Sequence, residues 1–367
     1  MRTDLSFMEE PMAFLDEWRR LYGQSDSRFF LSPAWAEAVI ASAPKRKKLA
    51  TVRVFDDLRG VYAMAFASAS PNPFASLMRA ARLQETGVEA VDRVYIEYND
   101  ILVARSAPDG ARDAAVSALF DGLPETDEFV FRNATPNLTA CVERAADARN
   151  LEIAFVKRQP TFAIDLAKGG DKGVMASFSS SLRSKIRRSI RRYEERGALS
   201  LKRPEGGAEK AVAWTELMRL HAQTWSRRGK RGVFNERAFC AFHERLIERY
   251  PENVDFVRLA AGDETIGVLY NFIERDRAYN YQSGFKYEAD NQLAPGFVCH
   301  ALAAEAYRTA GFLVYDLMGG DSDYKRRLGE EGEMLTTIAV SRRNLRSQMR
   351  SALKSATTPR DAKKRQT

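Results

Sequence analysis

The chain has 367 residues, of which 45% are hydrophobic and 29% are charged, a composition typical of folded globular proteins. This length exceeds the ~250–300 residues at which single hydrophobic cores stop growing, so it favours two domains. No apolar run reaches the ~20 residues of a membrane helix, residues 1–20 lack the apolar segment of a signal peptide, and the three scattered cysteines match no disulfide framework or metal motif. We therefore expect a cytoplasmic protein that binds no metal.

The net charge of +8 is concentrated at the C-terminal end. Residues 342–367 contain nine Lys or Arg and one Asp, so the rest of the chain sums to zero. A basic tail at 346–367 is expected either to stay solvated or to contact an anion, such as the inner face of a membrane. Arg342, Arg346 and Arg350 recur on one helical face, a spacing that suits a cyclic dinucleotide, although the D-x-S-x-x-G motif that accompanies such sites is missing. A neutral body argues against general nucleic-acid binding.

Helices and strands alternate along the first half, which predicts an α/β or α+β domain. The expected elements are helices at 11–22 and 33–42, strands at 49–55 and 61–67, a long surface loop at 68–94, a strand at 95–103, a helix at 109–122, a strand at 129–132, a helix at 136–149 and a strand at 151–157. This half contains no Gly-rich phosphate-binding loop.

A strongly basic helix begins the second half, after a strand at 161–166. Ser179 or Ser180 can cap it, and an apolar stripe runs along it with helical spacing. Its other faces carry Arg183, Lys185, Arg187, Arg188, Arg191, Arg192 and Arg196. These cations suit a phosphate-bearing substrate, such as a sugar nucleotide, a lipid-linked sugar or tRNA. The alternative is a solvated helix face that balances acidic neighbours.

Further helices are expected at 207–229 and 235–250, separated by a basic, Gly-containing loop at 227–232, and strands at 254–261, 266–274 and 277–284. A helix follows that opens at Leu293-Ala-Pro-Gly296 and ends at Gly311, then a strand at 312–318 and a short helix that carries Tyr324. The last strand is expected at 333–341 and a basic helix at 343–355. An open helix N-terminus after residue 294 suits a phosphate or pyrophosphate.

The segment LAPGF, followed by a helix and then G-F-x-x-Y-D-L-x-x-G-x-x-x-Y-K-R-R-L, resembles the C-terminal half of the FemAB-like acyltransferases of the GNAT superfamily, including the set associated with exopolysaccharide and cellulose synthesis. The matching residues are Pro295, Gly296, Asp316, Gly320, Tyr324, Lys325 and Arg326. The common GNAT pyrophosphate loop, (Q/R)-x-x-G-x-(G/A), is absent, and residues 292–296 match it only in part.

The resemblance implies two tandem GNAT-like domains, each a mixed central sheet flanked by helices, with the first degenerate for donor binding. The corresponding boundaries are 1–160 for the N-terminal domain, 161–345 for the acyltransferase domain and 346–367 for the tail. An internal repeat is not visible in the sequence.

Acyl transfer from a thioester to an amine needs a held donor, a stabilised oxyanion and protonation of the thiolate. By resemblance, the strands at 277–284 and 312–318 hold the donor between them, Tyr324 acts as general acid, and Asp316 accepts a proton or orients the acceptor. Their structural alternatives are a packing tyrosine and a strand-end cap. The implied donor-binding residues are Gln292, Ala294, Pro295, Gly296 and Phe297. The implied acceptor-binding residues are Tyr281, Gln282, Gly320, Lys325, Arg326, Arg187 and Arg191.

We therefore expect an N-acyltransferase that moves an acyl group, in the first instance acetyl, from acyl-CoA to an amino sugar of a surface polysaccharide or its precursor. One alternative is aminoacyl transfer from tRNA to a peptidoglycan precursor, as in the Fem enzymes. Another is a non-catalytic GNAT scaffold in polysaccharide synthesis. His221, His243 and His300 lie in no catalytic motif, so each is expected to be structural.

Overall fold

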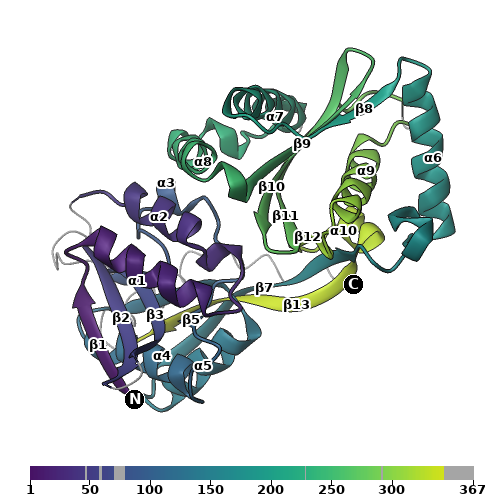
Figure 1. Cartoon of the computed structure of the whole chain (residues 1–367). Coiled ribbons are helices and arrows are strands. Elements are labelled where there is room, and N and C mark those ends of the chain that lie inside the picture. The colour runs from purple at the N-terminus through teal and green to yellow at the C-terminus, as the bar shows by residue number, and fades with distance from the viewer. Residues whose placement is uncertain (46–47, 58–59, 70–78, 228, 291, 343–367) are drawn as a thin grey trace, which may run out of the picture. The chain divides into compact units, whose positions relative to one another are not determined.

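A computed structural model describes residues 1–45, 48–57, 60–69, 79–227, 229–290 and 292–342 (Figure 1). The chain divides into two compact units. Unit 1 comprises Met1–Ser27, Ser42–Arg158 and the described residues from Thr336, and unit 2 comprises Arg28–Ala41 and Gln159–Leu335. The C-terminal helix expected at 343–355 and the tail at 346–367 lie outside the described residues.

Unit 1 is built on a sheet with the strand order β1-β2-β3-β4-β6-β13. Neighbouring strands are antiparallel, except that β4 and β6 are parallel. Helix α1 packs on one face, and α4 and α5 pack together on the other. The elements of this unit are β1 (Arg2–Phe7), α1 (Pro11–Gly23), β2 (Lys48–Asp56), β3 (Gly60–Ala69), β4 (Ala80–Leu83), α3 (Glu89–Asp92), β5 (Leu102–Val103), α4 (Ala111–Gly122), β6 (Glu128–Ala134) and α5 (Pro136–Asp147).

Unit 2 has the strand order β8-β9-β10-β11-β12-β7. Again the neighbours are antiparallel, except for the parallel pair β11 and β12. Helices α7 and α8 cover one face and α9 and α6 the other (Figure 1). The elements are α2 (Pro33–Ser42), α6 (Ser180–Glu194), β8 (Leu199–Lys202), α7 (Gly207–Arg227), α8 (Arg237–Arg249), β9 (Val254–Ala261), β10 (Glu264–Glu274), β11 (Arg277–Phe285), α9 (Pro295–Thr309), β12 (Val314–Gly319) and α10 (Asp323–Leu328).

The two units therefore share one topology, in which a parallel pair lies between antiparallel strands. Strands β7 (Glu152–Asp165) and β13 (Glu330–Ser341) each carry the chain from one unit into the other. As a result, β13 completes the sheet of unit 1 beside β6, and β7 completes the sheet of unit 2 beside β12. The expected fold of two tandem α/β units is confirmed.

Three expectations about the first half are wrong. The predicted loop at 68–94 contains β4, the parallel strand of unit 1, and the short helix α3; residues 70–78 of that loop are outside the described part. The predicted strand at 95–103 is reduced to β5, because Tyr95 and Tyr98 adopt left-handed backbone conformations that interrupt an extended strand. The predicted strands at 151–157 and 161–166 form one strand, β7.

Residues 28–41 belong to unit 2, although they lie early in the chain. The ring of Phe29 stacks on that of Phe272 in β10, with centroids 4.2 Å apart, and Trp35 packs edge-on against Phe242 of α8. These rings are fully buried, so burial of aromatic surface fixes this segment in unit 2. No helix in the described part of the chain is long and apolar enough to cross a membrane.

Candidate functional site

The parallel strands β11 and β12 pair only at their N-terminal ends. Arg277–Tyr279 pair with Val314–Asp316, and within the described residues the pairing stops there. Beyond this point β11 continues beside β10 to Phe285, and β12 continues beside β7 to Gly319. The two strands therefore splay apart over residues 280–285 and 317–319.

Helix α9 begins beside this splay without a side-chain cap. Pro295 occupies its first turn, and the backbone N–H of Ala294 donates to Ser189 Oγ of α6, 2.9 Å away. A Cβ added to Gly296 would meet the ring of Phe285, the last residue of β11, at 3.4 Å. The amides of the first turn and the helix dipole therefore favour an anion at this position.

Helices α6 and α9 pack against each other (Figure 1). Lys185 and Arg327 lie 5.1 and 5.0 Å from the centroid of the Phe297 ring, and Arg192 donates to Gln292 Oε1 at 3.0 Å. Arg196 forms an ion pair with Glu288 at 2.7 Å. Positions 185, 189, 192 and 196 share one helical face. Lys185, Arg192 and Arg327 thus contact residues that flank the uncapped N-terminus.

Arg187 and Arg191, which were expected to bind substrate, lie elsewhere on α6. Both are exposed, and their spacing places them on the sides of the helix that do not contact residues 288–297. The α6 cations on the face toward α9 are instead Lys185 and Arg192. Local spacing could not reveal this, because only the packing of α6 on α9 selects the inner face.

Tyr324, the expected general acid, lies on α10 with 37% of its surface exposed. Its ring stacks on that of His300 of α9, with centroids 5.6 Å apart and an interplanar angle of 15°. The His300 ring also contacts the edge of Phe285, with centroids 5.8 Å apart. Tyr324 is therefore placed at the splay, next to the end of β11 and the first turns of α9.

Asp316 is buried at the last position of β12 that pairs with β11. Its Oδ2 accepts from Arg277 Nη1 at 3.0 Å, and its Oδ1 accepts from the N–H of Met318 at 2.7 Å. Met318 has a left-handed backbone conformation, with φ of 65°. Both carboxylate oxygens are therefore engaged in holding the bend of β12, which matches the strand-end cap that the sequence left open.

Lys325 also holds the end of β12, because its ammonium donates to the carbonyls of Gly319 at 2.6 Å and Met318 at 3.3 Å. Gly320 lies beside that ammonium with φ of 117°, which favours glycine. Arg326 pairs with Asp321. Of these residues, which were expected to bind the acceptor, Lys325 is buried and is used structurally.

Tyr281 is the extra residue of a β-bulge, because Tyr270 pairs with Gln282 and Asn271 with Asn280. The bulge turns the Tyr281 side chain to the face covered by α7 and α8, where its ring lies 4.7 Å from that of Phe272. Gln282 follows the bulge, at the beginning of the splay. The bulge thus changes the alternation of side chains along β11 at the point where β11 and β12 separate.

A buried polar network fills the sheet face beneath α9, and sequence reasoning missed it. Asn280 donates to Asn271 at 2.9 Å, Asn271 donates to the Tyr307 hydroxyl at 2.8 Å, and Tyr307 donates to Asp255 at 2.6 Å. The signal available in the sequence was the pair of asparagines in otherwise apolar strands.

In unit 1, the position that corresponds to the splay is filled by the segment that contains Asn99. Strands β4 and β6 also stop pairing, after Arg82 and Val130, but Asn99 then pairs with the end of β6: its N–H donates to Asn133 at 3.1 Å, and its carbonyl accepts from the N–H of Thr135 at 3.0 Å. This segment occupies the position that is open in unit 2.

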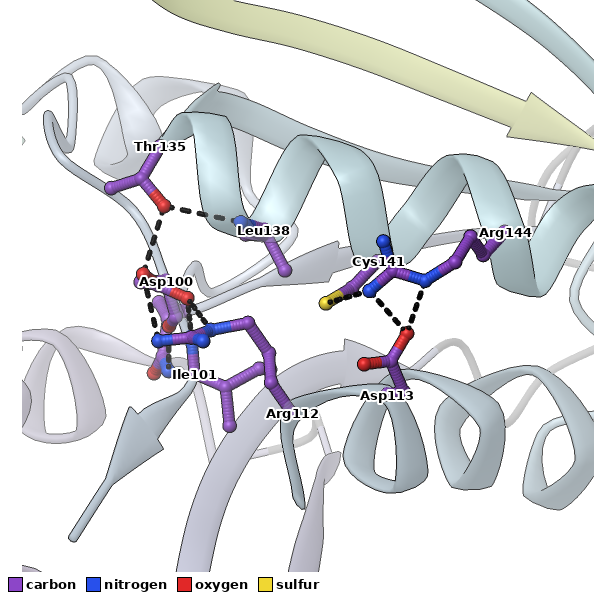
Figure 2. Close-up of polar contacts among 9 residues, drawn as sticks. Asp100, Ile101, Arg112, Asp113, Thr135, Leu138, Cys141 and Arg144 are labelled. Carbon is purple, nitrogen blue, oxygen red and sulfur yellow. Dashed lines mark hydrogen bonds and ion pairs between the residues drawn. The ribbon is translucent and has the colours of Figure 1, made fainter. Parts of the chain in front are cut away.

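The neighbouring Asp100 fastens the inserted segment (Figure 2). Its carboxylate accepts from Arg112 Nε at 2.7 Å, Thr135 Oγ1 at 2.8 Å and the N–H of Ile101 at 2.8 Å. Thr135 Oγ1 in turn accepts the N–H of Leu138 and so caps α5. Unit 1 therefore has the topology of unit 2 without its open splay.

Two other expectations concern regulators and metals. Arg342 donates to the carbonyls of Thr126 at 2.9 Å and Leu123 at 3.3 Å, so it is used inside unit 1; Arg346 and Arg350 lie outside the described residues. Across the described ranges, no group of three or more His, Cys, Asp or Glu side chains is close enough to hold a metal ion.

Comparison with known proteins identifies the fold. Residues 180–326 match the family model of an acetyltransferase (GNAT) domain. The whole chain is similar to the crystal structure of FemX, with a TM-score of 0.61 and 13% identity over 96% of this chain and 100% of that one. The C-terminal domain of a putative lysylphosphatidylglycerol synthetase from Agrobacterium fabrum matches with a TM-score of 0.53 and 11% identity, covering 95% and 96% of the two chains.

A tandem GNAT protein from the clavulanic acid biosynthesis pathway matches with a TM-score of 0.50 and 12% identity, covering 93% of this chain and 98% of that one. No curated protein matches the chain in sequence. The resemblance to FemAB-like GNAT acyltransferases is confirmed, and the paired topology agrees with a tandem GNAT arrangement.

Proposed function

From the GNAT acyltransferase domain at residues 180–326, we propose that this protein transfers an acyl group, in the first instance acetyl, from acyl-CoA to the amine of an amino sugar in a surface polysaccharide or its carrier-linked precursor. The observation that carries the proposal is the uncapped N-terminus of α9 beside the splay of β11 and β12, with Lys185 and Arg192 next to it. This arrangement suits the pyrophosphate of CoA, because backbone N–H groups and cations both favour it.

In this proposal the thioester lies along the splay, and the unpaired edges of β11 and β12 supply backbone groups to it. The acceptor amine attacks the thioester carbonyl, a C–N bond forms and the C–S bond breaks. The amine loses one proton to solvent, the Tyr324 hydroxyl gives one to the departing thiolate, and Tyr324 then regains a proton from solvent. Asp316 and Lys325 act indirectly, because they hold the bend of β12 that opens the splay.

A second candidate donor is aminoacyl-tRNA, which the Fem enzymes use. This route usually goes with a long helical hairpin, and the sequence predicts none, which argues against it. The match that covers the entire FemX chain weakens that argument, because a protein of this name fits without an added hairpin. Arg187 and Arg191 are exposed and suit such a polyanion.

The test is an assay of CoA release from acetyl-CoA with glucosamine as acceptor probe, with and without ribonuclease. Release that depends on glucosamine and resists ribonuclease supports the CoA-dependent proposal. Activity that appears only with aminoacyl-tRNA and is lost after ribonuclease treatment would move the assignment to the second donor.

A further inference from the structure

His300 is the buried end of a chain of hydrogen bonds that begins at an ion pair. Arg203 Nε donates to Asp255 Oδ2 at 2.9 Å, and the guanidinium of Arg203 lies 4.9 Å from the centroid of the Tyr307 ring. Asp255 also accepts the Tyr307 hydroxyl at 2.6 Å. A carboxylate only accepts hydrogen bonds, so the single proton of this hydroxyl is committed to Asp255.

This commitment fixes the orientation of the Asn271 amide. The Tyr307 oxygen can now only accept, so Asn271 must present its amide nitrogen there, at 2.8 Å. The Asn271 oxygen then faces the other way, where it accepts from Asn280 at 2.9 Å and from the Tyr315 hydroxyl at 3.5 Å. The Tyr315 hydroxyl also lies 3.0 Å from His300 Nδ1. When the Tyr315 proton is directed to Asn271, its oxygen accepts from His300 Nδ1.

In this arrangement the imidazole is protonated on Nδ1, and its Nε2 keeps a lone pair. Burial raises the pKa of Tyr307 and Tyr315 well above the usual range, so both hydroxyls keep their protons. Burial, together with the charge of Lys325, lowers the pKa of His300 to about 3, so the ring is neutral at physiological pH. The chain passes through a carboxamide, which does not relay protons readily, so it fixes orientation.

We propose that His300 is a further functional residue of the transfer reaction, one that accepts a hydrogen bond from the attacking amine through Nε2, with Tyr315, Asn271, Tyr307 and Asp255 as positioning residues that fix its tautomer. The ring lies between Phe285 at the end of β11 and Tyr324 on α10, so it is placed at the splay. A neutral imidazole orients an amine lone pair toward the thioester without repelling it. This inference rests on the proposed function.

His243 provides a matched control on the other face of the sheet. It is also fully buried, and its Nδ1 lies 3.1 Å from the hydroxyl of a tyrosine, Tyr270. Its ring contacts the aromatic rings of Phe242 in α8, Phe272 in β10 and Tyr281 in β11. Substitution of His243 therefore reports the cost of losing a buried histidine on the opposite face of the sheet.

The first test is the tautomer in the wild-type protein, measured by two-bond ¹H–¹⁵N correlation after ¹⁵N-histidine labelling. The chain has three histidines, so His221→Gln and His243→Gln variants assign the His300 signals even where a His300 variant does not fold. We expect a neutral Nδ1–H ring between pH 8 and pH 5, and a mixture of tautomers in Asp255→Asn. An Nε2–H ring or a titrating ring in the wild type overturns the inference.

The second test compares His300→Gln with His300→Asn in acetyl transfer from acetyl-CoA to glucosamine. Gln can place an acceptor near the Nε2 position, whereas Asn can replace only Nδ1. We expect kcat/KM for glucosamine to be at least about tenfold lower for Asn than for Gln, and His243→Gln to remain within about twofold of the wild type. Equal losses, or a greater loss for Gln, overturn the inference. If the wild type transfers no acetyl group, the proposed function fails. The tautomer measurement then tests by itself whether the hydrogen-bond chain orients His300.

Discussion

The hydroxyl of Ser189, in α6, accepts the backbone N–H of Ala294 at the start of α9, with 2.9 Å between oxygen and nitrogen. Both groups are buried. This bond fixes the basic helix against the helix whose N-terminus we propose to hold the donor pyrophosphate. Ser189 is therefore where the α6 and α9 parts of the candidate site meet.

Replacing Ser189 by Ala should leave the Ala294 N–H buried without a partner. We expect a loss of about 1–3 kcal/mol in the free energy of unfolding, and weaker acetyl-CoA binding because the start of α9 shifts. Urea unfolding and calorimetry measure the two effects. Ser184→Ala, at an exposed position on the same helix, should change neither. Equal effects of the two variants would contradict the proposed alignment.

The two basic faces of α6 predict different consequences for donor binding. The double variant K185Q/R192Q should lower acetyl-CoA affinity by about tenfold or more, because it removes cations beside the α9 N-terminus. R187Q/R191Q makes the same change in net charge on other sides of the helix and should alter donor affinity by about twofold or less. Similar losses for both would show that only net charge matters.

Tyr324→Phe removes the hydroxyl and keeps the ring that stacks on His300. We expect kcat for acetyl transfer to fall by about 10²–10⁴, the usual range for loss of a general acid, while acetyl-CoA affinity stays within about twofold. Steady-state kinetics and calorimetry separate these quantities. An unchanged kcat would assign Tyr324 to packing and remove it from the proposed mechanism.

Asp316 is predicted to act on stability more than on chemistry. Asp316→Ala leaves Arg277 without its buried partner and frees the Met318 N–H, so we expect a loss of about 3–5 kcal/mol in unfolding free energy. Asp316→Asn keeps an acceptor for Met318 and should cost less. If Asp316→Asn is as stable as the wild type yet loses more activity than Tyr324→Phe, the carboxylate is catalytic after all.

Glu85 predicts a pH dependence of stability in unit 1. Burial outweighs the nearby Arg132, 3.0 Å away, and raises the pKa of this carboxyl from 4.5 to about 8. A raised folded-state pKa means that the folded protein binds the proton more tightly than the unfolded chain does. Stability contributed by Glu85 is therefore lost as pH rises from about 4.5 to about 8.

Glu85→Gln is uncharged and should remove this pH dependence. We expect the unfolding free energy of Glu85→Gln, relative to that of the wild type, to increase as pH rises from 5 to 8. Urea denaturation of both proteins at each pH measures this difference. A difference between the two proteins that is the same at pH 5 and pH 8 would contradict the raised pKa.

Periodic segments of the fold could be predicted from sequence because their signals are local. The stripe of Leu182, Ile186 and Tyr193 predicted α6, Ser179 caps it as expected, and Pro295 stands in the first turn of α9. The alternating residues of β9, β10 and β11 likewise place those strands within a few residues of their observed bounds.

Long-range packing could not be predicted in this way. Nothing local indicates that Phe29 belongs against Phe272, or that β13 returns to pair with β6. The motif around Tyr324 indicated the strands of the candidate site, but His300, which stacks on Tyr324, was expected to be structural because it lies in no sequence motif. The hydrogen bonds through Tyr315 and Asn271, on which its proposed role rests, become visible only in the folded structure.

The most direct test of the account is isothermal calorimetry of the wild type, Gly296→Asp and Gly296→Asn with acetyl-CoA and with CoA. The backbone at Gly296 is not left-handed, and an added Cβ meets Phe285 at 3.4 Å, so both side chains fit the position. We predict a Kd between about 1 μM and 1 mM for the wild type, a small loss for Asn, and no binding for Asp, whose charge repels the pyrophosphate. Equal binding by Asp and Asn would contradict a donor site at the start of α9, and no binding by the wild type would contradict the CoA-dependent reaction itself.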